Sequence, residues 1–404
     1  MGKIVAAMAT VHAPQLFTRP PSEDLRQLDA DLEAMRELGK DLDATKPDAV
    51  IVIGADHLET FFLSSVPTFA VIAGEYSHAA FATKKYELPV HQGLAEDLLT
   101  KLIKADFDMA YSQDAELGHA YTAVYEWVLE GRKIPVVPFF VNVYLPPLPS
   151  TRRCQALGKA IAKIIAERPE NERIAIIASG GMSHYPGTWK YPQPAFDFDY
   201  WAIGQMEKGN HEALLELTVE QLDEVGNTEM LPWMILFGAI GNHPGELISY
   251  QPTWHHGHAV MRFIPDDRKT GKKCEEAKLA PEYNFKNTGA YEFYKPPAPS
   301  AFKLNKLIFD LRHDQQLRYR FLDNPPKISS EYGLNAEEAA AMEKMKDENI
   351  DVLRSLKNHP LVDAGAHPLG MLMGLVVVQA EARRLRAAGQ KPGELIEAGA
   401  GAAH

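Results

Sequence analysis

The amino-acid sequence predicts an α/β fold: a central, largely parallel sheet flanked by helices, followed by a C-terminal all-helical domain. The first observation is a set of short, continuously apolar runs, which are typical of parallel strands buried on both faces. The second is that amphipathic helical patterns alternate with these runs up to about residue 264. The third is that residues 302–387 carry only helical patterns, after the stiff proline-rich stretch 296–299.

Length and composition limit the class of protein. The chain has 404 residues, of which 46% are hydrophobic and 24% charged, as expected for a globular protein with more than one core. Its net charge of −12 argues against a nucleic-acid partner. We find no apolar run long enough to span a membrane, no signal-peptide pattern, and only two widely separated cysteines. We therefore expect a cytoplasmic protein with neither a nucleic-acid nor a membrane partner.

The first elements form a strand, a helix and a second strand. Residues 3–10 and 49–54 are apolar runs that predict buried strands. Between them, apolar residues recur at steps of three and four over residues 25–42, which predicts one apolar helix face. We expect a βαβ unit whose two strand ends are adjacent.

The rest of the first domain continues this alternation. Further strands are expected over residues 134–143 and 174–178, and two closing strands over 247–251 and 259–264. The expected helices cover residues 94–105, 122–129, 152–166, 201–208, 211–217 and 229–240.

The composition divides the chain into four parts. We expect a catalytic domain over residues 1–270, a linker over 271–300, a helical domain over 301–390 and a flexible tail over 391–404. Within the helical domain, apolar periodicity predicts helices over residues 302–322, 335–356 and 369–387.

Three histidines follow predicted strands. His12 comes after the first strand, His57 after the second, and His184 after residues 174–178. Ser179-Gly180-Gly181 breaks this last strand, because glycine allows the backbone to turn sharply. Open α/β sheets place their chemistry at such strand ends. Three strand-end histidines are more than core packing alone would produce.

Two histidines and one carboxylate are the ligand set that Fe(II) oxygenases commonly use, with open positions left for substrate and oxygen. His12 and His57 supply the histidines. Glu229 is the best carboxylate candidate, because it opens an apolar helix, where a buried glutamate without a partner would be costly. His184 and His119 are candidates for an acid/base that works near neutral pH.

At these residues the sequence resembles the class III extradiol ring-cleavage dioxygenases, the superfamily of protocatechuate 4,5-dioxygenase and gallate dioxygenase. The matching pieces occur in the family's order: Val11-His12-Ala13-Pro14, Ala55-Asp56-His57, Leu117-Gly118-His119, Ser179-Gly180-Gly181-Met182-Ser183-His184 and Thr228-Glu229-Met230-Leu231-Pro232-Trp233.

The resemblance implies a role for each candidate residue. His12, His57 and Glu229 would bind Fe(II), His184 would be the acid/base, and His119 would line the substrate pocket. It also implies a small aromatic diol and O2 as substrates, and a homo-oligomer. The C-terminal part resembles the helical α-subunit of protocatechuate 4,5-dioxygenase, and gallate dioxygenases carry both parts on one chain.

Three departures from the family pattern leave the ligand set intact. Gly118-His119-Ala120 stands where Asp-His-Gly is frequent, Ala55-Asp56-His57 where Asn-Asp-His is frequent, and Leu236-Phe237-Gly238 where Met-Arg-Gly is frequent. They leave the substrate open among gallate, protocatechuate, a methylated gallate and a dihydroxypyridine.

Two alternatives stay open. Two histidines and a glutamate are also a catalytic zinc set, so a zinc-dependent hydrolase on the same scaffold is one. A non-catalytic binding protein of the same superfamily is the other. The cluster His255-His256-Gly257-His258 also suggests a metal, but adjacent strand residues face opposite ways, so at most two of the histidines could share one site. We expect the cluster to lie beside an exposed turn and not to bind a metal, and we leave open that one histidine lines the pocket.

Overall fold

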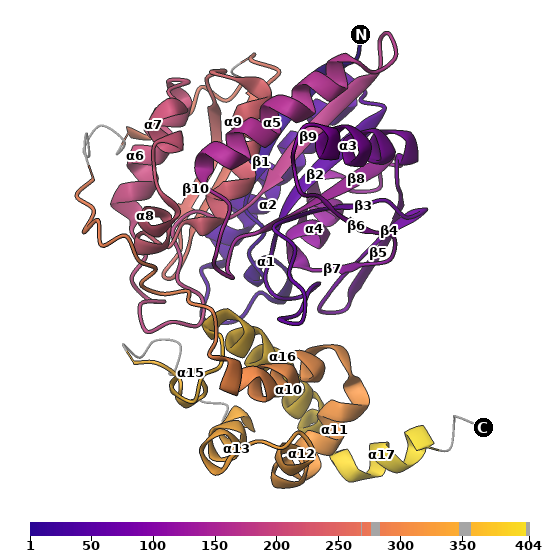
Figure 1. Cartoon of the computed structure of the whole chain (residues 1–404), viewed down its shortest axis with the longest axis vertical. Coiled ribbons are helices and arrows are strands. Elements are labelled where there is room, and N and C mark those ends of the chain that lie inside the picture. The colour runs from indigo at the N-terminus through magenta and orange to yellow at the C-terminus, as the bar shows by residue number, and fades with distance from the viewer. Residues whose placement is uncertain (268, 276–282, 347–356, 401–404) are drawn as a thin grey trace. The chain divides into compact units, whose positions relative to one another are not determined.

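The computed structural model describes residues 1–267, 269–275, 283–346 and 357–400, and its contacts group the chain into two compact units (Figure 1). The first unit comprises Met1–Thr60, Val66–His184 and Gln193–Phe293. The second comprises Phe61–Ser65, Tyr185–Pro192 and Tyr294–His404. The predicted fold class is confirmed: the first unit is α/β with a largely parallel sheet, and the C-terminal region is helical.

An eight-stranded sheet forms the centre of the first unit, in the order β10-β11-β1-β9-β2-β8-β3-β6. Its four central strands are parallel: β1 (Lys3–Thr10), β9 (Arg173–Ser179), β2 (Ala49–Asp56) and β8 (Val136–Asn142). At one edge β11 (Gly257–Ile264) and β10 (Glu246–Pro252) are antiparallel. At the other edge, β3 (Phe69–Ile72) runs antiparallel to β8 and pairs in parallel with β6 (Ala110–Ser112).

The strand order corrects one prediction. We expected the ends of β1 and β2 to be adjacent, but β9 lies between them. Thr10 and Gly54 both pair in register with Ser179 of β9, so the three strands end at one level. The apolar pattern of a strand buried on both faces does not encode its neighbour, so strand order could not be deduced from it.

Helices cover both faces of the sheet (Figure 1). α2 (Leu25–Thr45) and the π-helix η1 (Val124–Val128) share a core with alternate residues of the central strands. α5 (Thr151–Ala166) and α9 (Leu231–Ile240) pack on each other and on the central strands, and α3 (Gln92–Lys104) packs on α5, β3 and β8. The sheet is therefore buried on both faces, as its continuously apolar strands require.

Shorter elements complete the first unit. A second sheet has the order β5-β4-β7, with bounds Lys84–Pro89, Tyr76–Phe81 and Glu116–Leu117. The helix predicted over residues 122–129 is α4 (His119–Ala123) continued by η1. The other short helices are α1 (Gln15–Thr18), α6 (Phe196–Glu207), α7 (Glu212–Leu215), α8 (Val219–Glu224) and the 3₁₀ turn η2 (Thr228–Met230).

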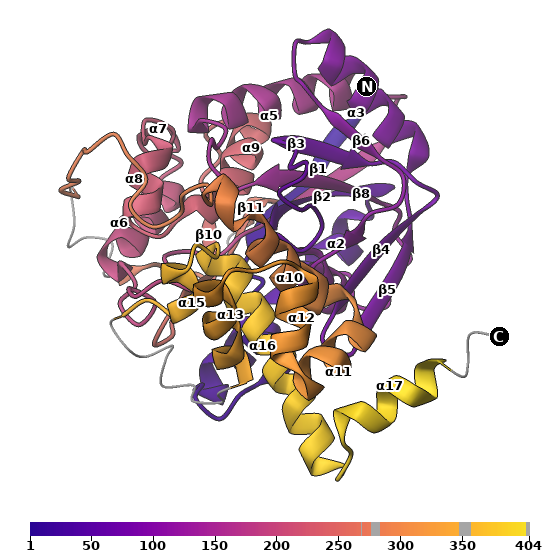
Figure 2. The ribbon, with the colours of Figure 1, turned by 60° about the horizontal axis from the view of Figure 1, so that its bottom comes forward.

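The second unit is helical (Figure 2). Its core contains the pair α10 (Phe302–His313) and α16 (Pro368–Ala387), which lie side by side in both views. The remaining helices described are α11 (Gln315–Asp323), α12 (Pro325–Glu331), α13 (Ala336–Glu343), α15 (Pro360–Asp363) and α17 (Pro392–Ala400), with the 3₁₀ turns η4 (Pro299–Ala301) and η5 (Lys344–Lys346).

Two predicted helices differ from the structure. The one over residues 302–322 is broken at Asp314, because the Asp314 carboxylate accepts a hydrogen bond from Leu317 N at the start of α11. The one over residues 335–356 is described only as far as residue 346, and its remainder lies outside the described residues. The segment expected to be a flexible tail contains α17, and its flexibility stays a prediction.

Two loops from the N-terminal part of the sequence also belong to the second unit. In the loop Phe61–Ser65, the Phe62 ring lies 4.9 Å from that of Phe309. In the loop Tyr185–Pro192, the Pro186 carbonyl accepts a hydrogen bond from Tyr294 Oη. Across the described ranges, we find no helix whose length and hydropathy would suit a membrane span.

Candidate active site

The candidate site lies at the carboxyl ends of the four parallel strands. His12 follows β1, His57 follows β2, Tyr144 follows β8 and His184 follows β9. Glu229 comes from η2, directly before the apolar helix α9. The register places neighbouring strand ends together, so residues more than a hundred positions apart meet at one edge of the sheet.

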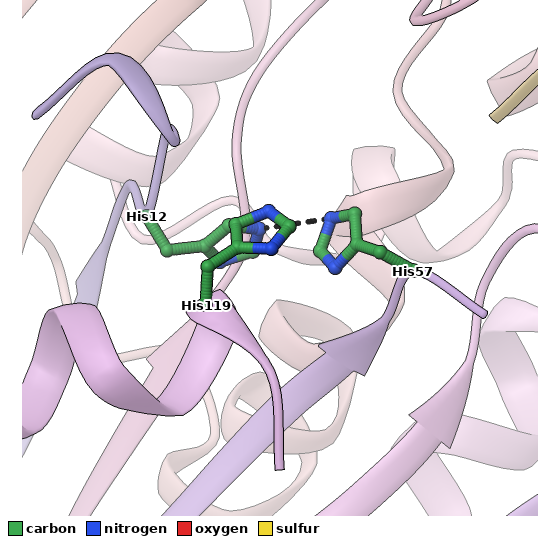
Figure 3. Close-up of side chains that lie close together, drawn as sticks. All are labelled: His12, His57 and His119. Carbon is green, nitrogen blue, oxygen red and sulfur yellow. Dashed lines mark hydrogen bonds between the residues drawn. The ribbon is translucent and has the colours of Figure 1, made fainter. Parts of the chain in front are cut away.

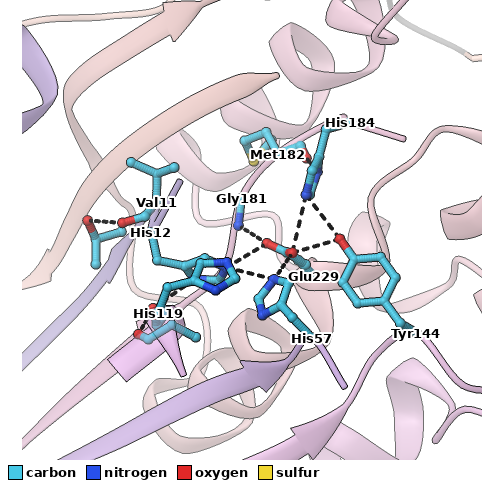
Figure 4. A network of polar contacts seen from close by, with 12 residues as sticks. Val11, His12, His57, His119, Tyr144, Gly181, Met182, His184 and Glu229 are labelled. Atoms are coloured by element: carbon cyan, nitrogen blue, oxygen red, sulfur yellow. Dashed lines mark hydrogen bonds and ion pairs between the residues drawn. The ribbon is translucent and has the colours of Figure 1, made fainter. Parts of the chain in front are cut away.

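The side chains of His12, His57 and Glu229 converge (Figure 4). The two histidine Nε2 atoms are 3.2 Å apart. His12 Nε2 lies 3.1 Å from Glu229 Oε2, and His57 Nε2 lies 2.7 Å from Glu229 Oε1. All three side chains are buried, with residue exposures of 1%, 3% and 0%.

These separations fit a metal ion. An ion bound about 2.1 Å from each of three ligand atoms, at right angles, holds those atoms about 3.0 Å apart. Two neutral imidazoles and a carboxylate suit Fe(II) and also Zn²⁺. The donor set therefore fits a divalent transition metal, and it does not distinguish Fe(II) from Zn²⁺.

The tautomer of His12 suits a ligand. Ser179 Oγ donates a 2.6 Å hydrogen bond to the Ala120 carbonyl, so it accepts at His12 Nδ1, 2.9 Å away. The proton is thus on Nδ1, and the Nε2 lone pair points at Glu229 and His57. Ser179 opens the same glycine-containing stretch that leads to His184, and it is fully buried.

Burial also sets the charge of the cluster. Burial is the largest influence on both histidines: it lowers the pKa of His57 to about 3, and it also lowers the pKa of His12. Both rings are therefore neutral near pH 7, which is the form that binds metals. Burial opposes ionisation of Glu229, but its histidine neighbours, led by His12, hold the pKa of this carboxyl well below its usual range.

Two further groups hold the Glu229 carboxylate. Gly181 N–H donates a 2.6 Å hydrogen bond to Oε2, and Tyr144 Oη donates a 2.7 Å hydrogen bond to Oε1. A side chain at position 181 would place its Cβ 3.1 Å from Oε2 and 2.0 Å from His256 Nε2. Glycine is therefore required here by close approach, and this explains one glycine of the Ser179–His184 stretch.

His119 lies beside the two histidines (Figure 3). Its ring centroid is 4.0 Å from that of His57 and 5.3 Å from that of His12. The Glu59 carboxylate accepts from both His119 Nδ1 (2.8 Å) and His119 N (3.1 Å), which fixes the ring and the start of α4. A Cβ at Gly118 would collide with Glu59 Oε2 at 1.7 Å.

His184 is oriented by its own loop. Its Nδ1 lies 2.8 Å from the Met182 carbonyl, and since a carbonyl only accepts, the proton is on Nδ1. Nε2 faces the cluster, 3.0 Å from Tyr144 Oη and 3.2 Å from Glu229 Oε1 (Figure 4). Nε2 is therefore the nitrogen that can gain and lose a proton inside the site.

The structure brings all five predicted site residues together: His12, His57, His119, His184 and Glu229. Sequence reasoning missed Tyr144, Ser179 and Glu59. Tyr144 lies two residues after the end of β8, as His12 does after β1, so the strand-end rule that selected the histidines could have found it. Glu59 carries no such signal, because its contact with His119 depends on how two separate loops meet.

The structure contradicts the exposed setting expected for the cluster His255-His256-Gly257-His258. All three histidines are buried, and none lies in an exposed turn. Their stretch leads into β11, and His256 pairs with His184 through an isolated antiparallel bridge. The sequence pattern was misleading because it does not show that β11 lies between β1 and β10, or that residues 182–184 pair with residues 256 and 257.

The buried histidine–carboxylate cluster at the strand ends of this sheet could hold a metal ion, at the place where α/β enzymes commonly keep their active sites. The family model of the catalytic LigB subunit of aromatic ring-opening dioxygenase matches residues 6–261. The chain belongs to this family, which is of the class III extradiol type.

Two curated relatives share part of the sequence. Both are named 2,3-dihydroxyphenylpropionate/2,3-dihydroxicinnamic acid 1,2-dioxygenase. The one from Burkholderia vietnamiensis is 35% identical over 160 residues, which are 39% of this chain and 50% of the relative. The one from Escherichia coli is 31% identical over 177 residues, which are 43% and 55% of the two chains. The similarity thus spans about half the length of these relatives.

Proposed function

We propose that this protein is a non-haem Fe(II)-dependent extradiol dioxygenase that cleaves a small dihydroxylated or trihydroxylated aromatic ring with O2. The observation that carries the proposal is the convergence of His12, His57 and Glu229, whose ligand atoms lie 2.7–3.2 Å from one another at the end of the sheet. Membership of the LigB family supports it.

In this proposal His12, His57 and Glu229 hold the iron. Bound Fe(II) supplies the redox chemistry that couples O2 to an aromatic diol. Ser179 keeps the His12 lone pair directed at the ion, and Gly181 N–H with Tyr144 Oη fixes the carboxylate plane of Glu229. Burial of the set keeps competing water out of the site.

His184 would serve as the acid/base. Its Nδ1 proton is tied to the Met182 carbonyl, which leaves Nε2 to take a proton from a ring hydroxyl and to return it as the ring opens. His119, held by Glu59, would orient the substrate by hydrogen bonding.

The substrate class follows from the same site. We expect the ring to offer two adjacent oxygens to the open side of the metal, and the family resemblance leaves gallate, protocatechuate, a methylated gallate and a dihydroxypyridine open. The names of the two relatives add 2,3-dihydroxyphenylpropionate and its cinnamic analogue. We also propose that the protein is cytoplasmic and that it forms a homo-oligomer. Size-exclusion chromatography with light scattering would test the oligomeric state.

The test is O2 uptake by protein purified without oxygen and loaded with Fe(II), against a panel of these rings. The expected result is one O2 consumed per ring, with a yellow or near-ultraviolet ring-opened product. Resorcinol, whose hydroxyls are not adjacent, is the matched negative substrate. Stoichiometric iron with no uptake on any ring would contradict the substrate class. Failure to bind iron would contradict the ligand set and favour the zinc or non-catalytic alternative.

A further inference from the structure

His256 lies against the face of His184. The two ring centroids are 3.7 Å apart and the ring planes are inclined by only 14°, which is a face-to-face stack. Both residues are buried, with exposures of 3% and 6%. The stack therefore places one flat face of His184 directly against His256.

The backbone holds this stack in register. Residues 184 and 256 form an isolated antiparallel bridge. Met182 N–H donates to the Gly257 carbonyl at 2.9 Å, and Gly257 N–H donates to the Ser183 carbonyl at 2.9 Å. Side chains of directly opposed residues lie on the same face of such a pair. The loop that carries the acid/base candidate is thus fastened to the start of β11.

A buried chain of groups supports His256 from behind. The His258 ring meets the His256 ring edge-on, with centroids 4.5 Å apart and an interplanar angle of 89°. His258 Nδ1 lies 2.7 Å from Asp31 Oδ2, and both side chains are fully buried. Asp31 belongs to α2, so the stack rests on the largest helix of that face rather than on a loop.

Three constraints therefore act on His184. His256 covers one ring face, the Met182 carbonyl ties Nδ1, and Nε2 faces Tyr144 and Glu229. The carbonyl contact alone would let the ring swing about the Nδ1 hydrogen bond. The stack removes that freedom, because rotation of the ring out of its plane would collide with His256.

We propose that His256 is a positioning residue: its stacked ring fixes the plane of His184 so that Nε2 points at the substrate position. The inference rests on the proposed role of His184 as acid/base. Misplacement of a reacting group by about 1 Å can cost about 100-fold in rate. A stack that holds the ring should therefore act on kcat more than on KM.

A rival role is metal ligation, because the ligand atoms of His256, His184 and Glu229 all lie within 4.8 Å of one another. His256 Nε2, however, faces the Cα of Gly181, where an added Cβ would be 2.0 Å away. The two roles predict different results. Loss of a ligand releases metal, whereas loss of a stacking partner leaves the metal in place.

The test compares His256→Phe, which keeps a flat ring without nitrogen, with His256→Gln, which keeps a polar group without a ring. For His256→Gln we expect kcat to fall about 10- to 100-fold with iron content unchanged and KM within about threefold. His256→Phe should recover most of this loss. His255→Gln, a buried histidine of the same turn that does not stack on His184, is the matched control and should keep wild-type kcat.

Crystal structures of the variants give a readout that needs no turnover. In His256→Gln the His184 ring should be rotated or disordered, and in His256→Phe it should keep its wild-type plane. Equal or better activity of His256→Gln would overturn the proposal, and so would iron loss in either variant. If His256→Phe does not fold, His256→Ala takes its place, because alanine adds no atoms. An unchanged kcat or an unchanged plane of the His184 ring in His256→Ala would contradict the proposal. Absence of turnover in the wild type would contradict the proposed function, while the ring orientation would still test the stack.

Discussion

Tyr144 Oη donates a 2.7 Å hydrogen bond to Oε1 of Glu229. The same hydroxyl lies 3.0 Å from His184 Nε2, so one phenol links the candidate carboxylate ligand to the candidate acid/base. Tyr144 is buried at 1% exposure and lies two residues after the end of the parallel strand β8. The two parts of the proposed chemistry are therefore joined by one buried side chain.

Removing this hydroxyl should slow turnover. In Tyr144→Phe the ring still packs, but Glu229 loses a donor and His184 loses its neighbour. Outer partners of ligands typically contribute about 10- to 100-fold in affinity or activity, and we expect a fall in kcat/KM of that size. Tyr125→Phe is the matched control, since Tyr125 Oη bonds Ser77 Oγ in a buried place away from the site. Equal loss in both variants would contradict a specific role for Tyr144.

Variants of the metal ligands and of the acid/base should differ in their iron content. His12→Ala and Glu229→Ala should each lose most bound iron, because two remaining ligands hold a divalent ion poorly. His184→Ala should keep iron and lose nearly all turnover. Elemental analysis after anaerobic loading measures the first, and O2 uptake the second. Full iron in both ligand variants would show that the ligands are misassigned.

Gly181→Ala should disturb the site although it replaces no titratable residue. The added Cβ would lie 2.0 Å from His256 Nε2 and 3.1 Å from Glu229 Oε2, so the loop must shift. We expect lower iron affinity and at least about a tenfold loss of activity. Gly93→Ala in α3 is the control, because its Cβ would meet nothing closer than 3.8 Å. That change should leave activity intact and stabilise the helix by roughly 0.5–1 kcal/mol.

The buried carboxyl of Asp199 should give a stability difference that depends on pH. Burial raises the pKa of Asp199 to about 8, although Ser183 N–H and Tyr250 Oη donate to it. The folded protein then holds a proton that the unfolded chain has released, so wild-type stability falls as pH rises from about 4 to about 8. Asp199→Asn imitates the protonated form and lacks this slope.

Denaturant unfolding of the wild type and Asp199→Asn at pH 5, 7 and 9 measures the difference directly. The variant should gain stability relative to wild type between pH 5 and 7, with a further gain up to pH 9. Parallel curves at all three pH values would mean that Asp199 is ionised in the folded protein. Because Asp199 supports the backbone of Ser183, beside His184, activity of the variant should be recorded too.

Much of the fold could be read from local pattern. Continuous apolar runs predicted β1, β2, β8 and β9, because a strand buried on both faces has no polar side. Apolar steps of three and four predicted α2 and α5, because one face of each helix packs on that sheet. The strand-end rule and the family resemblance selected His12, His57, His119, His184 and Glu229, and the chain brings these together.

Sequence by itself therefore determined the four central strands and the two closing strands, the residue types at the ends of the central strands, and the family. Only the tertiary structure decided that β9 separates β1 from β2, that Tyr144 joins Glu229 to His184, and that His256 stacks on His184. The physical reason is the separation of the interacting residues along the sequence. Periodicity reports the burial of one face of one segment. Strand order and ring stacking depend instead on pairings between distant segments, which only the packing of the whole unit selects.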